Sequence, residues 1–113
     1  MRVSLSLGSS LAKYLFKKKF LSKERFPLVL MLEVTHLCNL ACEGCGRIRE
    51  YKETMREMLS VEECIQAVDE CPAPVVTVTG GEPLMHPEID KIISAIIEKK
   101  RHIYLCTNGI LLA

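Results

Sequence analysis

The sequence contains no tryptophan, and aromatic residues amount to only 5% of its 113 residues. Single-stranded nucleic acids are usually bound by stacking of bases on aromatic side chains, so no nucleic-acid partner is expected. The formal net charge is only +1, which excludes a strongly basic or strongly acidic protein. No stretch approaches the ~18 consecutive apolar residues of a membrane span, and the first residues lack a signal-peptide pattern. These absences indicate a small globular chain, expected to be cytoplasmic.

Although the net charge of the whole chain is near zero, its N-terminus is basic. Residues 1–25 contain seven lysines and arginines and one acidic residue, whereas residues 26–113 contain eight basic and thirteen acidic residues. Residues 1–26 are predicted to form a basic helical segment, separate from the rest of the chain. One interpretation of residues 13–25 is peripheral attraction to anionic lipid. The other is a solvated helix that packs on the outside of the domain, and both stay open.

The pattern of this segment is not that of a simple amphipathic helix. One side of the predicted helix carries apolar residues with a lysine, Lys18, among them (Leu7, Leu11, Tyr14, Leu15 and Leu21). Phe16 and Phe20 face the other way. Pro27 then ends the segment and opens an extended one.

The remaining chain alternates between predicted strands and helices. The nearly continuous apolar run of residues 28–35 predicts a strand buried on both faces. Ser60 and Glu63 form a capping-box pattern that opens a helix ending near Cys71. Residues 75–79 form the next strand, a helix starts at Pro87 and carries basic residues 99–101 in its last turn, and residues 103–106 form a third strand. This βαβαβ order predicts an α/β fold with a right-handed parallel sheet.

Six cysteines are many for this length, and three of them fall within eight residues. Cys38, Cys42 and Cys45 follow the first predicted strand, whereas the other three are predicted to be packing residues (Cys64, Cys71 and Cys106). A disulfide framework belongs to secreted proteins, so clustered thiols in a reduced chain indicate a metal site. Three thiolates leave one coordination position open, as in catalytic sites. An iron–sulfur cluster and a zinc ion completed by His36 both fit the residues.

Two further motifs are predicted at the same edge of the sheet. Gly80-Gly81-Glu82-Pro83 follows the second strand, and Thr107-Asn108-Gly109 follows the third. The carboxyl ends of parallel strands are where α/β proteins bind ligands. Two glycines would let a ligand approach the backbone, and the Glu82 carboxylate could accept from an ammonium group. An ordinary turn is the alternative for each motif, and His86 is predicted to cap the following helix.

The cysteine spacing Cys38-x₃-Cys42-x₂-Cys45, followed by Gly80–Pro83, resembles the radical S-adenosylmethionine (SAM) superfamily. The resemblance implies a partial (β/α)₆ barrel. It also implies a [4Fe–4S] cluster held by the three cysteines, with SAM on its fourth iron. Gly80, Gly81, Glu82 and Pro83 are then expected to bind the methionine ammonium group, and Thr107 and Asn108 are further candidates for cofactor binding. The superfamily commonly has an aromatic residue where this chain has Gly44.

Most of residues 26–112 more narrowly resemble the hopanoid-biosynthesis branch, the adenosylhopane synthases. The resemblance rests on residues 27–33, 38–48, 63–71 and 105–108. It implies a transferase that adds a 5′-deoxyadenosyl radical to the double bond of a triterpene, with flavodoxin or ferredoxin as reductant. A radical SAM enzyme with another substrate and a small zinc-binding interaction module are the alternatives. Residues 27–113 are expected to be the first half of the core domain, truncated from a protein roughly three times longer.

Overall fold

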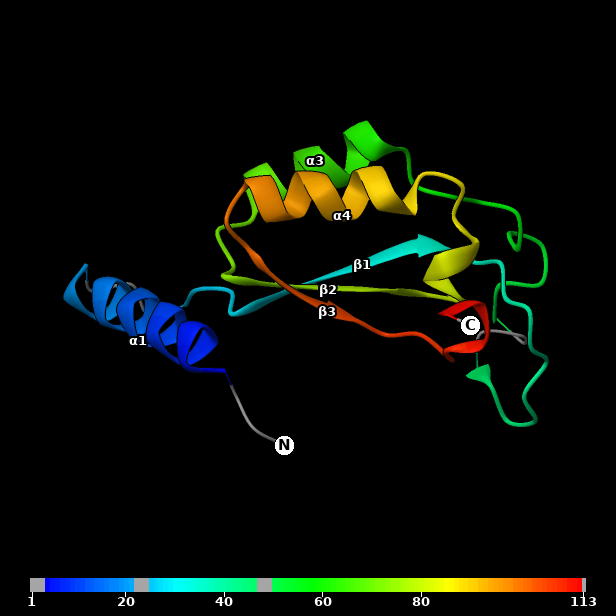
Figure 1. Ribbon diagram of the computed structural model, residues 1–113, viewed down its shortest axis with the longest axis horizontal. Helices are drawn as coiled ribbons and strands as arrows, with labels where there is room; N and C mark the ends of the chain where they lie inside the picture. Colours follow the sequence, from blue (N-terminus) through cyan, green and yellow to red (C-terminus); the bar gives the residue numbers. More distant parts are fainter. Residues whose placement is uncertain (1–3, 22–24, 47–49, 113) are drawn as a thin grey trace.

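The computed structural model describes residues 4–21, 25–46 and 50–112. A parallel sheet of three strands, in the order β1-β2-β3, carries two helices on one of its faces (Figure 1). The elements are α1 (Leu5–Phe20), β1 (Val29–Thr35), α3 (Val61–Glu70), β2 (Val75–Gly80), α4 (Ile89–Glu98) and β3 (His102–Leu105), with short 3₁₀ helices η1 (Pro83–Met85) and η2 (Ile110–Leu112).

Both strand pairs are parallel, which confirms the predicted βαβαβ order. Val29 of β1 lies opposite Val75 of β2, and Val78 of β2 lies opposite Leu105 of β3. Residues 57–59 add an antiparallel bridge at the outer edge of β1, through Met58 and Thr35. The carboxyl ends of all three strands therefore point to one edge of the sheet, where the predicted motifs follow.

The core lies between the sheet and the helix pair α3 and α4. Its buried residues come from both layers and are all apolar side chains or a thiol (Leu32, Val34, Cys64, Val68, Val76, Val78, Ile92 and Ile96). The prediction that β1 is buried on both faces is wrong, since Val29 is 51% and Met31 66% exposed. Both helices cover the same face of the sheet, which leaves alternate residues of β1 uncovered (Figure 1).

Helix α3 begins as its sequence predicts. The Ser60 hydroxyl accepts from the backbone N–H of Glu63 at 3.1 Å, and the Glu63 carboxylate accepts from the backbone N–H of Ser60 at 2.7 Å. This capping box satisfies two of the N–H groups that a helix start leaves without intrahelical partners. The loop that precedes α3 is thereby held at a defined angle to the sheet.

Helix α4 differs from its prediction at both ends. It begins at Ile89 rather than at Pro87, because the chain first forms η1 and the buried imidazole of His86 then accepts from the backbone N–H of Glu88 at 3.1 Å. The expected capping of the helix by His86 is not confirmed, because the N-cap residue of α4 is Glu88 and the helix has no side-chain capping bond; His86 bonds only the backbone N–H of that N-cap residue. Since its Nδ1 accepts there, Nε2 carries the proton that is donated to the Leu59 carbonyl at 2.7 Å.

The basic residues predicted in the last turn of α4 lie beyond it. Lys99 is the C-terminal cap, and Lys100 has a left-handed φ of 57°. The guanidinium of Arg101 donates instead to the carbonyls of Cys71 and Ala73, at the end of α3. Arg101 thus stabilises the C-terminus of α3 rather than that of its own helix.

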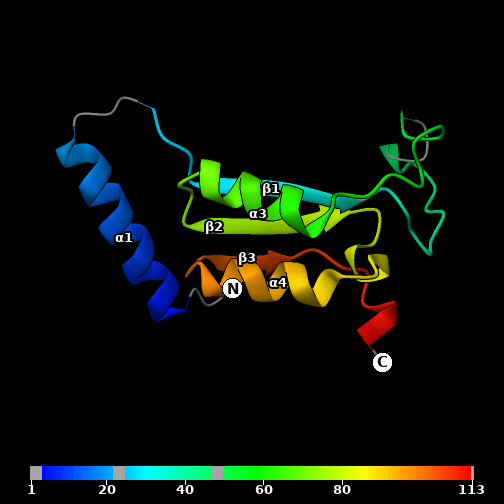
Figure 2. The ribbon, with the colours of Figure 1, turned by 90° about the horizontal axis from the view of Figure 1, so that it is seen from above.

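Helix α1 confirms the predicted N-terminal helix and lies across the amino ends of the strands (Figure 2). The Tyr14 hydroxyl donates to the Pro27 carbonyl at 2.6 Å, and Ser10 Oγ lies 2.9 Å from His102 Nε2. Lys18 lies 5.4 Å from the centroid of the Tyr14 ring, a cation–π contact that explains a lysine on the packed side. Among the described residues, no helix has the length and apolar character to cross a membrane.

The cysteines differ sharply in exposure, and this generates a prediction. Burial raises the pKa of the Cys64 thiol to about 11, with a further contribution from the Glu63 carboxylate. Cys42 and Cys106 are exposed, so the predicted packing role of Cys106 is wrong, and Cys71 is half-buried. We expect mildly alkaline iodoacetamide to label Cys42 and Cys106 rapidly and Cys64 only after unfolding in urea, as read by peptide mass spectrometry. Equal labelling of Cys64 and Cys42 in the folded chain would contradict the packing of α3 on the sheet.

Candidate functional site

Three loops meet at the carboxyl edge of the sheet. A cavity of about 190 Å³ opens between them, and residues of all three predicted motifs line it (Cys38, Leu40, Cys42, Cys45, Gly80, Gly81 and Asn108). The structure thus brings the three cysteines together with the double glycine and with Asn108. Glu82, Pro83 and Thr107 lie in the same loops but do not line the cavity.

The cysteine loop contains a tight turn. The backbone N–H of Cys45 donates to the Cys42 carbonyl at 3.2 Å. Gly44, between them, has a φ of 78°, a conformation that residues with a side chain rarely adopt. The turn accounts for the glycine at this position, where the family that the sequence resembles commonly has an aromatic residue. It places Cys42 and Cys45 on the same short segment, facing one cavity.

The donor set fits an iron–sulfur cluster, because thiolates are its usual ligands and each binds a different iron. The three cysteines share one cavity, the arrangement that a polynuclear centre requires. In the part of the chain that the structure describes, no three His, Cys, Asp or Glu side chains form a group that could hold a single metal ion.

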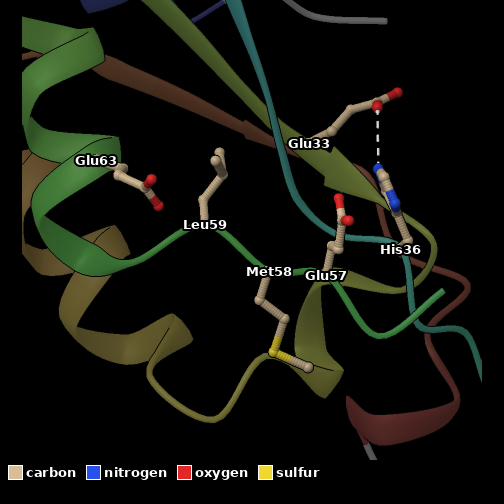
Figure 3. A pocket seen from close by; sticks show the side chains of 6 residues that line it. All are labelled: Glu33, His36, Glu57, Met58, Leu59 and Glu63. Atoms are coloured by element: carbon tan, nitrogen blue, oxygen red, sulfur yellow. Dashed lines mark ion pairs between the residues drawn. The ribbon is translucent and has the colours of Figure 1, made fainter. Parts of the chain in front are cut away.

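His36 belongs to a different cavity, of about 320 Å³, whose lining includes Glu33, Glu57 and Glu63 (Figure 3). Its Nδ1 lies 3.0 Å from the Thr54 carbonyl oxygen, and its ring stacks on Tyr51 at 4.2 Å. Its Nε2 faces the Glu33 carboxylate at 4.0 Å (Figure 3). The described residues therefore do not form the alternative zinc site with His36 as fourth ligand.

The two glycines of the second loop permit a close backbone contact rather than only the approach of a ligand. A Cβ on Gly80 would lie 2.2 Å from the Thr35 carbonyl oxygen, and one on Gly81 would lie 2.0 Å from that of Leu37. The backbone N–H of Gly81 donates to Thr35 at 2.8 Å, and that of Glu82 donates to Leu37 at 2.7 Å. These bonds attach the second loop to the start of the cysteine loop. Both glycines also line the cavity, so their predicted cofactor contact stays a prediction.

The carboxylate of Glu82 is fully buried and bonded within the protein. Its Oε1 accepts from Thr107 Oγ1 at 2.7 Å and from the Leu84 backbone N–H at 3.0 Å. Its Oε2 accepts from the Asn108 backbone N–H at 2.8 Å. Burial raises the pKa of Glu82, but the bonds from Asn108, Thr107 and Leu84 together outweigh it, and the net pKa is lowered. The predicted contact to an ammonium group stays a prediction, since the structure shows these internal donors.

A pair of amides joins the third loop to the cysteine loop. Asn108 Nδ2 donates to Asn39 Oδ1 at 2.8 Å, while Asn108 Oδ1 accepts from the Ile110 backbone N–H at 3.0 Å. Thr107 Oγ1 donates to Glu82 and accepts from the Gly109 backbone N–H at 3.1 Å. Sequence reasoning missed Asn39. The available signal was its position next to Cys38, at the edge that Asn108 shares.

Over residues 32–113, the chain matches the family model described as the radical SAM superfamily. The match includes the three cysteines, Gly80–Pro83, and both Thr107 and Asn108. Members of this superfamily bind a [4Fe–4S] cluster and SAM, which agrees with a cavity lined by three thiols.

Curated relatives include enzymes with different named activities. The PqqA peptide cyclase of Granulibacter bethesdensis is 30% identical over 89 residues, 76% of this chain and 24% of the relative. The GTP 3′,8-cyclase 1 of Mycobacterium tuberculosis is 35% identical over 94 residues, which cover 74% of this chain and 26% of the relative. The subtilosin biosynthesis protein AlbA of Bacillus subtilis is 27% identical over 114 residues, which cover 96% of this chain and 24% of the relative. The chain thus spans about a quarter of these relatives. No solved structure matches it significantly.

The buried carboxylate predicts a pH-dependent stability. Because the pKa of Glu82 in the folded chain lies below its ordinary value of 4.5, the carboxylate stabilises the fold above pH 4.5 and ceases to do so as the pH falls through the folded pKa. We expect Glu82→Gln to lower the free energy of unfolding by about 1–3 kcal/mol at neutral pH, since an amide N–H₂ must face a donor. The difference from the wild type should shrink below pH 4.5, as measured by urea unfolding.

Exposed Glu98 on α4 provides the matched control, and Glu98→Gln should leave the unfolding free energy nearly unchanged at neutral pH. If Glu82→Gln lowered the free energy of unfolding by the same amount in acid as at neutral pH, the charge of the carboxylate would not be the cause of the loss.

The close backbone contact at Gly81 predicts a second difference between variants. Gly81→Ala should destabilise the chain by about 1–3 kcal/mol, because the new methyl group meets the Leu37 carbonyl. Gly46→Ala is the control, since a Cβ at Gly46, beside Cys45, meets nothing within 4 Å. Thermal and urea unfolding of both variants tests this, and equal stability would contradict the described contact between the loops.

Proposed function

Since this chain belongs to the radical SAM superfamily, we propose that Cys38, Cys42 and Cys45 hold a [4Fe–4S] cluster and that the chain binds SAM beside it. When bound, the cluster supplies the electron that cleaves SAM into methionine and a 5′-deoxyadenosyl radical. The observation that carries the proposal is the single cavity lined by the three thiols, Gly80 and Gly81. Three protein ligands leave the fourth iron for the amino and carboxylate groups of SAM.

The chain's own residues position this chemistry. The loop of Gly80 and Gly81 lies against the cysteine loop through two backbone hydrogen bonds, so a methionine group on the cluster would lie beside it. Glu82 has a positioning role, because its buried carboxylate accepts from the backbone N–H of Asn108 and holds that residue at the cavity. Asn108 also lines the cavity and is the candidate for contact with the nucleotide.

For the substrate, we propose a hopanoid triterpene alkene, which would make the enzyme an adenosyl transferase of hopanoid biosynthesis. The resemblance of residues 27–33, 38–48, 63–71 and 105–108 to that branch supports this proposal, and Gly44 agrees with it. A carbon–carbon bond forms between C5′ and one alkene carbon. The addition would leave an unpaired electron on the other alkene carbon, which one electron and one proton would convert into the C–H bond of the saturated product. The proposed reductant is a flavodoxin or ferredoxin, and the proposed location is the cytoplasm.

The cluster is tested by anaerobic reconstitution with iron and sulfide. We expect about four irons and four sulfides per chain with visible absorption. The variant Cys38/Cys42/Cys45→Ala should lose them, while Cys71→Ala and Cys106→Ala should retain them, since neither residue lines the cavity. Stoichiometric zinc in place of iron, or an equal loss in the control variants, would overturn the proposal.

The substrate is tested with the reconstituted chain, SAM, dithionite and a hopene. Formation of an adenosylated triterpene, identified by mass spectrometry, supports the hopanoid proposal. Formation of 5′-deoxyadenosine without that product, and faster turnover with a peptide or GTP, would overturn the branch and retain the superfamily chemistry. These two competitors are chosen because the relatives named above are a peptide cyclase and a GTP cyclase.

A further inference from the structure

Helix α1 is held to the domain by one face. Its half-buried residues recur with helical spacing on that side (Leu7, Ser10, Leu11, Tyr14 and Lys18). Two of them make polar contacts with the domain, Tyr14 with the Pro27 carbonyl and Ser10 with His102. These contacts fix the rotation of the helix about its axis. The opposite face is therefore held outward.

That opposite face carries a row of apolar side chains. Leu5, Ala12, Phe16 and Phe20 are seven, four and four residues apart, so they share one side of the helix, here called the outer stripe. Leu5 is 94%, Phe16 68% and Phe20 79% exposed. The two phenyl rings lie together, with centroids 5.5 Å apart. Adjacent exposed aromatic side chains such as Phe16 and Phe20 mark an interaction surface.

Positive charge flanks the outer stripe. Lys13, Lys17 and Lys19 are exposed, and residues 5–20 contain no aspartate or glutamate. Lys19 and the two phenylalanines line an apolar hollow of about 370 Å³. A face with aromatic side chains at its centre and only cations beside it is complementary to a surface that is apolar inside and anionic outside.

We propose that α1 docks on an anionic membrane surface through the outer stripe, with its lysines at the lipid phosphates. The helix has 16 residues, so it would lie in the interface rather than cross it. A second copy of this chain is the less favoured occupant, because the same lysines would face one another and repel. The charges thus select the lipid surface.

This docking is distinct from the proposed radical chemistry. Helix α1 lies at the amino ends of the strands (Figures 1 and 2). The cysteine cavity lies at their carboxyl ends. A docked chain would keep the cavity at the end remote from the membrane. Lipid binding can be measured without cluster or SAM, so its failure is distinguishable from failure of the proposed function.

The absence of tryptophan from the sequence permits a clean probe. In Phe16→Trp, the single indole should shift its emission to shorter wavelength when vesicles containing about one-third phosphatidylglycerol are added. Tyr104→Trp is the control, since Tyr104 is 54% exposed on β3, away from the outer stripe, and its emission should not shift. Pure phosphatidylcholine vesicles should give a much smaller change in Phe16→Trp.

Co-sedimentation with the same vesicles measures the affinity. Phe16→Ser/Phe20→Ser should weaken binding more than about tenfold. Lys13/Lys17/Lys19→Gln should weaken it by roughly tenfold to a hundredfold, with the loss reproduced in the wild type at high salt. Ile97→Ser and Lys91→Gln change an exposed apolar residue and an exposed lysine on α4, and both variants should bind as the wild type does. Circular dichroism checks that each variant is folded.

Two results would overturn the proposal. One is binding that is equal for anionic and neutral vesicles, or absent with both, in the folded wild type. The other is concentration-dependent dimerisation in sedimentation equilibrium that the phenylalanine variant abolishes while lipid binding is unchanged, which would assign the outer stripe to a second copy of the chain.

Discussion

The carboxyl edge of the sheet depends on one buried carboxylate. Glu82 is enclosed by protein, and donors from two loops surround it: the Leu84 backbone in its own loop, and Thr107 and Asn108 in the next. A buried charge without such partners would be strongly unfavourable, so the two loops are stable in this arrangement only together. The same hydrogen bonds stabilise the charged carboxylate and thereby lower the pKa of Glu82.

The cysteine loop is attached to this pair of loops from two sides. On one side, the backbones of Gly81 and Glu82 donate to Thr35 and Leu37, contacts that only glycine at positions 80 and 81 allows. On the other side, the Asn108 amide donates to Asn39, the residue after the first cysteine. Polar contacts thereby join the three short loops, while the apolar core lies beneath α3 and α4.

Most elements were predictable because their signals are local. The apolar runs of the strands and the Ser60 capping box form where the sequence predicts, within one or two residues. The N-terminal helix lies inside the predicted segment of residues 1–26, over Leu5–Phe20. The errors arose where distant residues decide the outcome. Arg101 was assigned to the end of its own helix, but the carbonyls at the end of α3 lie within its reach. The prediction that β1 is buried on both faces was wrong because α3 and α4 pack on the same face of the sheet.

The sequence by itself determined the strand and helix order, the three-thiol donor set and its position after a parallel strand, since each depends on residue type and short-range spacing. Only the tertiary structure decided what each motif contacts. It placed His36 in a separate cavity, assigned the close approach at Gly80 and Gly81 to backbone of the first loop, and buried Glu82 among donors from other segments. The reason is physical: hydrogen-bond partners and burial depend on which segments meet in space, and the two asparagines that join these loops are 69 positions apart in the sequence.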